Sequence, residues 1–119
     1  MGIAHHSNYL VWFEVGRTDL CREAGLPYRS IEERGYILVV TEVNCRYLAP
    51  FAYDDEVIVE TSIGEAGSRM MRFEYILQTS GEELCATGFS RHVWLDRISR
   101  RPVVAPRELM SPFLPFVVG

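Results

Sequence analysis

The sequence has 119 residues, of which 48% are hydrophobic, and this size suits one globular domain over residues 1–119 without room for a second core. Its 16 acidic and 12 basic residues give a net charge of -4 and are interspersed along the chain. This pattern lacks the basic stripe of a nucleic-acid-binding protein, so we expect no nucleic-acid partner.

The cysteines and the short apolar runs indicate a reducing, aqueous compartment. Cys21, Cys45 and Cys85 are odd in number and lack CxxC spacing, so we interpret them as reduced core thiols. No apolar run approaches the roughly 20 residues that span a bilayer, and the first residues do not resemble a signal peptide. We therefore expect a cytoplasmic protein without a membrane span.

Residues 7–24 have the periodicity of one amphipathic helix that ends at Gly25 and Pro27. The apolar positions are Tyr9, Leu10, Phe13, Leu20, Cys21 and Ala24. The polar positions opposite them are Arg17, Asp19, Arg22 and Glu23. Gly16 lies in the middle, where glycine costs about 1 kcal/mol relative to alanine. We expect a sheet to approach the helix closely at that residue.

After a short helical turn at residues 27–34, the period of the pattern changes from 3.6 to 2. Four strands are predicted, at residues 36–48, 56–63, 69–79 and 84–95, with short turns between them. The proline-rich tail from residue 101 is expected to be irregular or a short helix. This order predicts an α+β fold in which one long helix packs on one antiparallel sheet.

Alternation within the strands predicts their faces. The first strand places on one face Val39, Thr41, Val43, Cys45 and Tyr47. The third strand places on one face Met71, Phe73, Tyr75 and Leu77. The last strand alternates Cys85, Thr87, Phe89, Val93 and Leu95 with Ala86, Gly88, Ser90, His92 and Trp94.

The most informative stretch is at the start of the chain, where a glycine-containing loop leads into the helix with His5 and His6 beside it. Helix N-termini present free N–H groups and a partial positive charge, which suit the oxyanion of acyl chemistry. Two alternatives remain open. The histidines could be surface or capping residues, or a metal pair, although no third ligand lies at recognisable spacing.

Residues 1–18 read MGIAHHSNYLVWFEVGRT, and they resemble the signature of the 4-hydroxybenzoyl-CoA thioesterase-like hotdog proteins, above all the subgroup near the Tol-Pal-associated acyl-CoA thioesterase. The family pattern Asp-x-x-Gly-x-x-x-His-x-x-Tyr, followed by an aromatic-Glu pair and an arginine, is matched by Gly2, His6, Tyr9, Phe13-Glu14 and Arg17. Further similarity lies at residues 35–36, 48–50 and 100–103, so the resemblance covers nearly the whole chain.

The resemblance implies a hotdog fold, in which an antiparallel sheet wraps one long central helix. It also implies an acyl-CoA thioesterase that releases a free acid and coenzyme A without a cofactor, as a homodimer or homotetramer. The family's catalytic aspartate and its N-terminal strand would precede Met1, so we expect the numbered sequence to start inside a longer protein. The alternative is a non-catalytic hotdog module that binds acyl-CoA or acyl-carrier thioesters.

The resemblance also suggests catalytic roles for two residues. The backbone N–H near His6 would polarise the thioester carbonyl, and the His6 side chain would act as acid, base or orienting group. Glu14 lies where some hotdog thioesterases place a catalytic carboxylate. The alternative for Glu14 is an ion pair with Arg17 at i, i+3 that contributes about 0.2–0.5 kcal/mol.

Candidate substrate-binding residues lie in two groups. The first group is at or near the helix start and comprises Gly2, Asn8, Tyr9 and Phe13, with Trp12 beside them. The second group would contact coenzyme A and comprises Ser68, Arg69 and Arg91, with Arg72 as a further anion contact. The alternatives are ordinary core packing for the aromatic residues, helix capping for Asn8 and a solvated sheet face for the arginines.

Overall fold

The computed structural model describes residues 6–52 and 54–118, with backbone only at residues 6–8. Its elements, in chain order, are α1 (His6–Glu23), α2 (Tyr28–Glu33), β1 (Tyr36–Tyr47), β2 (Val57–Ala66), β3 (Met70–Thr79), β4 (Leu84–Asp96), α3 (Arg107–Met110) and the 3-10 helix η1 (Ser111–Phe116). The helix, the helical turn, the four strands and the short helical tail expected from the sequence are all confirmed.

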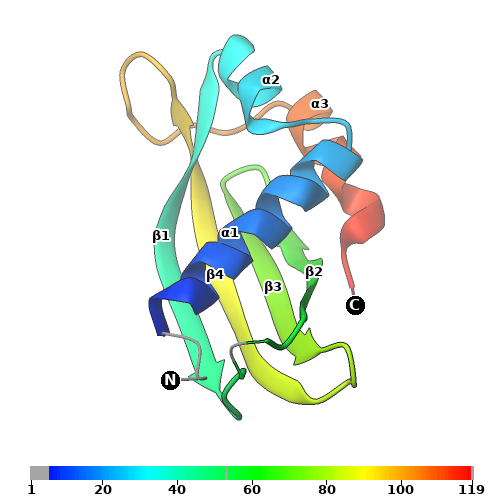
Figure 1. The fold of residues 1–119 in the computed structure, drawn as a ribbon. Helices are drawn as coiled ribbons and strands as arrows, with labels where there is room; N and C mark the ends of the chain where they lie inside the picture. The colour runs from blue at the N-terminus through cyan, green and yellow to red at the C-terminus, as the bar shows by residue number, and fades with distance from the viewer. Residues whose placement is uncertain (1–5, 53, 119) are drawn as a thin grey trace.

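The four strands form one antiparallel sheet in the order β1-β4-β3-β2. Helix α1 lies across one face of this sheet, and α2 lies beside the first residues of β1 (Figure 1). The α+β arrangement predicted from the change of period is therefore confirmed.

The core lies between α1 and the sheet. On β3, the side chains of Met71, Phe73, Tyr75 and Leu77 are buried toward the helix, as the alternation predicts. The ring of Phe13 on α1 stacks on the ring of Tyr75, with centroids 4.3 Å apart. Gly88 on β4 makes room for this stack, because a Cβ there would lie 2.6 Å from the Phe13 ring and would also meet the carbonyl oxygen of Asn44.

Gly16 marks the closest approach of α1 to β2. A Cβ at Gly16 would lie 2.7 Å from Cγ1 of Val59 and would also meet the hydroxyl of Thr61. The expected approach of the sheet is confirmed, and the atoms that enforce it belong to side chains of β2. Glycine fits this helix position because a Cβ would require the side chains of Val59 and Thr61 to shift.

The polar and apolar faces of α1 differ from the prediction at two positions. Leu10, expected in the core, is 45% exposed. Arg17, expected on the polar face, is half-buried and hydrogen-bonds to Tyr75 on the sheet. The helix ends as predicted, since Gly25 has a φ of +80° and only glycine adopts that conformation readily.

A β-bulge corrects the predicted faces of β1. The register with β4 shifts between Val40 and Glu42, so Thr41 is an extra residue on β1. Val39 therefore pairs with Val93 on one face, whereas Val43 pairs with Ser90 on the other. The prediction that Val39, Thr41, Val43, Cys45 and Tyr47 share one face is wrong because strict alternation cannot include an inserted residue.

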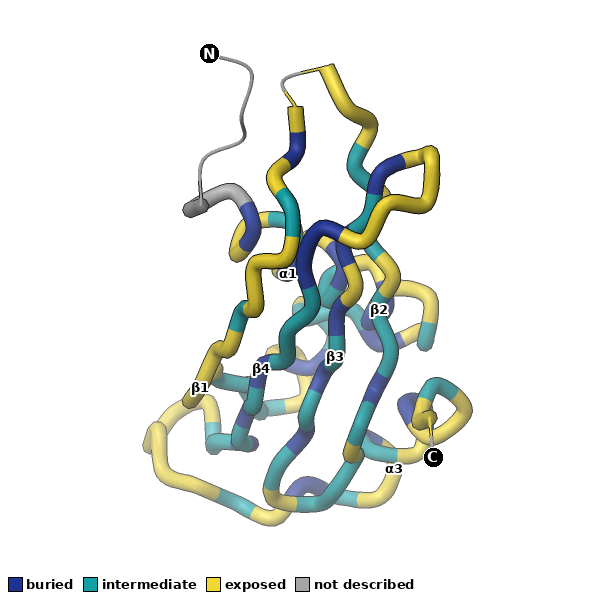
Figure 2. The backbone as a smooth tube through the Cα atoms, turned by 90° about the horizontal axis from the view of Figure 1, so that it is seen from below, coloured by how far each residue is buried: buried dark blue, intermediate teal, exposed yellow. Residues whose placement is uncertain are grey.

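The two edges of the sheet are covered differently. At the edge formed by β2, the tail returns and the N–H of Val118 donates to the carbonyl of Ile63 at 2.9 Å. Strand β1 forms the other edge over 12 residues, and most of its second half is exposed (Figure 2). Its exposed side chains include Val40, Val43 and Tyr47, which lie on the face toward α1.

Candidate active site

The start of α1 is the place where the sequence predicted acyl chemistry. The helix begins at His6, which agrees with the expected start near Ser7. The first N–H groups of an α-helix have no partner within the helix, and the helix dipole makes this end positive. These amides can donate hydrogen bonds to the oxygen of a polarised carbonyl. Gly2 lies outside the described residues, as do the side chains of His6 and Asn8.

Aromatic side chains surround the first turns of α1. The ring of Tyr9 lies 4.9 Å from that of Tyr47, at the end of β1, and 5.8 Å from that of Phe51. Trp12 lies 5.2 Å from Phe51 and is half-buried. Tyr9 and Phe13 are buried in the core. These contacts fit the core-packing alternative for both residues and form an apolar base under the helix start.

Glu14 lies on the solvent side of α1. Its side chain is exposed, and together with Val11, Val15, Thr18 and Asp19 it lines a shallow surface hollow. Among the ion pairs of the described residues, none joins Glu14 to Arg17. The structural alternative for Glu14 is therefore wrong, because Arg17 turns toward the sheet instead.

Arg17 starts a buried hydrogen-bond network that links α1 to the sheet. Its Nε donates to the Tyr28 hydroxyl at 2.7 Å, and its Nη1 donates to the Tyr75 hydroxyl at 3.0 Å. The Tyr75 hydroxyl lies 2.5 Å from Oγ of Ser90, and that oxygen lies 2.8 Å from Nε2 of His92. The network runs from the middle of the helix to the centre of β4.

His92 is the buried histidine at the end of this network. It is 1% exposed, and its Nδ1 has no hydrogen-bond partner among the described residues. Burial, together with the positive charge of Arg17, lowers the pKa of His92 to about 3. His92 is therefore neutral at pH 7, with one ring nitrogen acting as donor and the other as acceptor.

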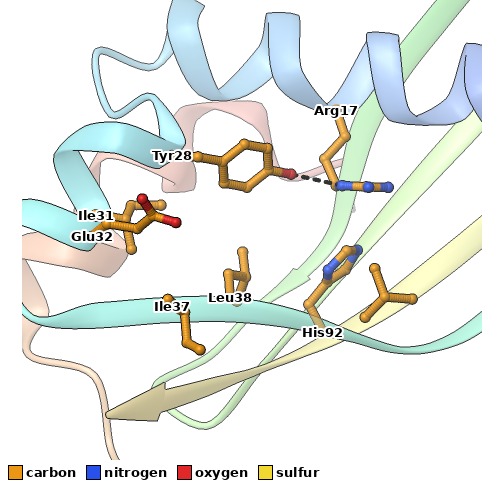
Figure 3. A pocket seen from close by; sticks show the side chains of 8 residues that line it. Arg17, Tyr28, Ile31, Glu32, Ile37, Leu38 and His92 are labelled. Carbon is orange, nitrogen blue, oxygen red and sulfur yellow. Dashed lines mark hydrogen bonds between the residues drawn. The ribbon is translucent and has the colours of Figure 1, made fainter. Parts of the chain in front are cut away.

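A pocket of about 300 Å³ lies next to this network, between α1, α2 and the first half of β1 (Figure 3). Its lining comprises Arg17, Tyr28, Ile31, Glu32, Ile37, Leu38, Val40 and His92. Sequence reasoning missed Tyr28 and His92 as site residues. The available signal was the alternation of the last strand, which places Ser90 and His92 on the same face.

The candidate coenzyme A contacts lie away from the helix start. The hairpin with Ser68 and Arg69 is beside Trp94. The backbone N–H of Trp94 donates to the Arg69 carbonyl at 3.3 Å. Trp94 pairs with Leu38, whereas the helix start is beside Tyr47. These two positions lie roughly 30 Å apart along β1 at about 3.3 Å per residue. One copy of the chain therefore does not bring the two groups of candidates together.

Two of the candidate arginines lie on the sheet face that points away from α1. Arg91 pairs with Glu42 at 3.3 Å, and Arg72 pairs with Glu74 at 3.0 Å. Arg72 and Arg91 are also direct cross-strand neighbours. Their carboxylate partners balance the two like charges. Arg69, in contrast, is exposed at the hairpin and takes part in none of the ion pairs of residues 6–52 and 54–118.

Comparison with known sequences identifies the family. The family model described as "Thioesterase-like superfamily" matches residues 1–113. This chain belongs to the thioesterase-like superfamily. It is also 34% identical over 103 residues to "Putative acyl-CoA thioesterase YneP" of Bacillus subtilis (strain 168), an alignment that covers 87% of this chain and 75% of that protein.

Solved structures agree with this membership. The hypothetical protein TT1821 from Thermus thermophilus is 34% identical, with a TM-score of 0.88 over 98% of this chain and 88% of that chain. The DHNA-CoA thioesterase from Staphylococcus aureus is 29% identical, with a TM-score of 0.81 over 87% of this chain and 70% of that chain. The chain thus has the hotdog fold of the thioesterase-like superfamily, as the resemblance implied.

Three further features concern the described part of this thioesterase-like chain. None of its helices has both the length and the apolar character needed to cross a membrane. No group of three or more histidine, cysteine or acidic residues within residues 6–52 and 54–118 is placed to hold a metal ion. Cys21, Cys45 and Cys85 are all unpaired thiols, and burial raises the pKa of Cys21 to about 11.

Proposed function

We propose that this chain is an acyl-CoA thioester hydrolase that releases a free acid and coenzyme A. The observation that carries the proposal is the family match over residues 1–113, which includes the helix start and the sheet beneath it. The names of the Bacillus subtilis and Staphylococcus aureus relatives support a CoA thioester as the substrate. The single domain is proposed to span residues 1–119.

The start of α1 is the proposed position of the thioester carbonyl. The free amides beside His6 would hold its oxygen and stabilise the negative charge that develops there. The imidazole of His6 is proposed to orient or protonate the reacting groups, because its ordinary pKa of about 6.5 lies near neutral pH. Gly2 and Asn8 are proposed to bind the substrate around this point, with Tyr9 and Phe13 as the apolar base beneath it.

Hydrolysis also needs a general base or nucleophile, and a carboxylate can take either role. The first turn of α1 contains no acidic residue, and Glu14 is the first carboxylate along this helix. Its exposed position in a hollow with Val11 and Val15 suits a group that completes a site when another surface covers it. Glu14 is therefore the proposed catalytic carboxylate of the numbered chain.

We infer that the covering surface is a second copy of the chain, as a dimer or a larger homo-oligomer. A long exposed strand edge with apolar side chains favours pairing with another strand. Antiparallel pairing of two β1 edges would place the Tyr47 end of one copy beside the Tyr36 end of the other. The helix start of one copy would then approach the hairpin with Ser68 and Arg69 of its partner.

In this arrangement, Arg69 is the proposed contact for the phosphates of coenzyme A, because it is exposed and has no ion-pair partner in the described part of the chain. Ser68 and Arg91 are proposed as further contacts. A cytoplasmic location and a place in the Tol-Pal-associated subgroup belong to the same proposal, supported by the three unpaired thiols and by the motif at residues 1–18.

The experiment that tests this function is a free-thiol assay. The protein, with any residues that its gene encodes before Met1, is incubated with a panel of short, long, branched and aromatic acyl-CoA substrates. We expect at least one substrate to release coenzyme A with saturation kinetics. Stabilisation by acyl-CoA without release of thiol would contradict hydrolysis and support the binding-module alternative.

Two variants test the assigned residues in the same assay. His6→Ala and Glu14→Gln are each expected to lower kcat by about 100-fold or more, the usual range for lost acid-base groups. Glu23→Gln is the matched control, since Glu23 is an exposed carboxylate at the other end of α1 and should leave kcat unchanged. If Glu14→Gln behaves like Glu23→Gln, Glu14 is not the catalytic carboxylate.

A further inference from the structure

The pocket beside His92 is separate from the proposed position of the thioester carbonyl within one chain. Arg17 lies roughly 16 Å from His6 along α1 at about 1.5 Å per residue. Figure 3 shows Arg17, Tyr28 and His92 at the pocket, together with the apolar side chains of Ile31, Ile37 and Leu38 that also line it. No step of the proposed hydrolysis uses these groups, so their arrangement needs its own explanation.

Arg17 contributes a positive charge to the pocket. None of the ion pairs of the described residues involves Arg17. Burial raises the pKa of its hydrogen-bond partners Tyr28 and Tyr75, so both phenols are neutral at pH 7. Glu32 lines the pocket from α2, but it is exposed to solvent. A bound anion would offset the cost of this partly buried charge.

The hydrogen bonds of the network have a preferred direction. Arg17 donates to Tyr75, so the phenol can donate its own proton to Ser90, and Ser90 can donate to Nε2 of His92. This direction places the proton of the neutral imidazole on Nδ1. The reverse direction would leave both the Tyr75 proton and Nδ1 without a partner among the described residues.

His92 Nδ1 is therefore a buried N–H donor without an acceptor among the described residues. A buried donor of this kind is unfavourable, and few native structures keep one without a ligand or water. Arg17 Nη2 supplies a second donor, because the hydrogen bonds of Arg17 within the described residues involve only Nε and Nη1. The pocket thus presents donors and positive charge.

We propose that this pocket binds a carboxylate, with one oxygen accepting from Arg17 Nη2 and the other from His92 Nδ1. A carboxylate has acceptor oxygens and no donor, which matches both groups. The walls formed by Ile31, Ile37, Leu38 and Val40 suit a short hydrocarbon body attached to it. A volume of about 300 Å³ is at the small end for ligand pockets and fits a small acid.

Two kinds of molecule can supply this carboxylate. One is a free carboxylic acid. The other is a thioester held at the helix start of a second copy, whose acyl group has a second carboxylate at its far end, and this source rests on the proposed thioesterase function and on the proposed pairing of two β1 edges. The binding chemistry is the same for both, so the experiments first test the carboxylate and then its source.

Binding is tested by adding hexanoate or its neutral analogue hexanamide to the protein. The ¹⁵N resonance of His92 Nδ1 reports binding. We expect hexanoate to shift this resonance and to bind at least about tenfold more tightly than hexanamide, because only the acid balances the charge of Arg17. Equal binding of the two compounds, or an unchanged His92 resonance at millimolar hexanoate, would overturn the proposal. This comparison uses the unsubstituted protein and does not depend on the folding of a variant.

Two substitutions test the donor itself. In His92→Asn the amide lies near the position of Nδ1, whereas in His92→Gln it lies near that of Nε2 and keeps only the contact with Ser90. We therefore expect His92→Asn to retain more of the affinity for hexanoate than His92→Gln. An affinity in His92→Gln equal to that of the unsubstituted protein would show that Nδ1 is not the donor.

The source is tested by comparing hydrolysis of adipoyl-CoA with that of hexanoyl-CoA, which lacks the second carboxylate. A preference for adipoyl-CoA in kcat/KM that is lost in His92→Gln identifies the acyl group as the source. Equal rates together with hexanoate binding identify a free acid. Hexanoate binding without hydrolysis of any thioester would contradict the proposed function and leave the pocket proposal supported. Hydrolysis without carboxylate binding would contradict the pocket proposal and leave the proposed function supported.

Discussion

At the scale of single residues, Gly88 shows how the absence of a side chain shapes the core. A Cβ on Gly88 would meet the ring of Phe13, which stacks on Tyr75, and the carbonyl oxygen of Asn44 on the neighbouring strand. The sequence places Gly88 within a strand, where glycine is usually unfavourable. The contact with Phe13 explains why glycine is present there.

We expect Gly88→Ala to lower the free energy of unfolding by about 1–3 kcal/mol, the usual cost of overpacking a core. The added methyl group would lie 2.6 Å from the Phe13 ring. Urea unfolding measures the change. Gly81→Ala is the control, because its Cβ would lie 3.7 Å from the nearest atom, and it should be near neutral. Equal stability of the two variants would contradict the packing described for Gly88.

His92 gives a second prediction at this scale, for stability against pH. The unfolded chain binds a proton at His92 near the ordinary pKa of 6.5, whereas burial lowers the folded pKa to about 3. Between these values the unfolded state binds more protons, so the free energy of unfolding should fall as pH falls from about 6.5 to about 3. The contribution is on the order of a few kcal/mol.

Urea unfolding at several pH values tests this linkage. His92→Gln removes the titrating group, and its stability should depend less on pH within this window than that of the unsubstituted protein. The other members of the network, Arg17, Tyr75 and Ser90, are unchanged in this variant. Parallel pH profiles for the two proteins would rule out His92 as the source of the acid sensitivity.

At the scale of elements, the period of the hydrophobic pattern was sufficient to predict where helices and strands exist and which of the two each one is. It predicted the long helix, the helical turn at residues 27–34 and all four strands, because each has a strong local pattern. It did not predict the bulge at Thr41, since one inserted residue leaves the composition of the strand unchanged. It also did not predict the inward direction of Arg17, because the partners Tyr28 and Tyr75 are 11 and 58 residues away in the chain.

Strand β1 gives the prediction at the scale of elements. If its edge joins two copies, Val43→Asp should place a charge in that interface and convert the oligomer to a monomer, as measured by light scattering with size-exclusion chromatography. Ile98→Asp is the control, because Ile98 is 85% exposed in the turn after β4 and should leave the mass unchanged. An oligomer of unchanged mass in Val43→Asp would place the interface elsewhere.

At the scale of the whole molecule, the sequence resemblance identified the hotdog fold and the family, because a motif at the helix start accompanies that architecture. The residues of the candidate site could not be assembled in the same way. Sequence spacing does not reveal that the helix start and Arg69 lie at opposite ends of one sheet. The Arg17–His92 network was missed for the same reason, since it connects α1 to β4 through tertiary contacts.

The central claim is that thioester hydrolysis uses the helix start of one copy and the hairpin of another. The most direct test mixes two impaired variants, His6→Ala and Arg69→Ala, under conditions in which the subunits exchange. Coenzyme A release is then measured at low substrate concentration. Each mixed dimer would contain one intact site, so a 1:1 mixture should recover about a quarter of the unsubstituted kcat/KM. No recovery above the separate variants would contradict a site shared between copies.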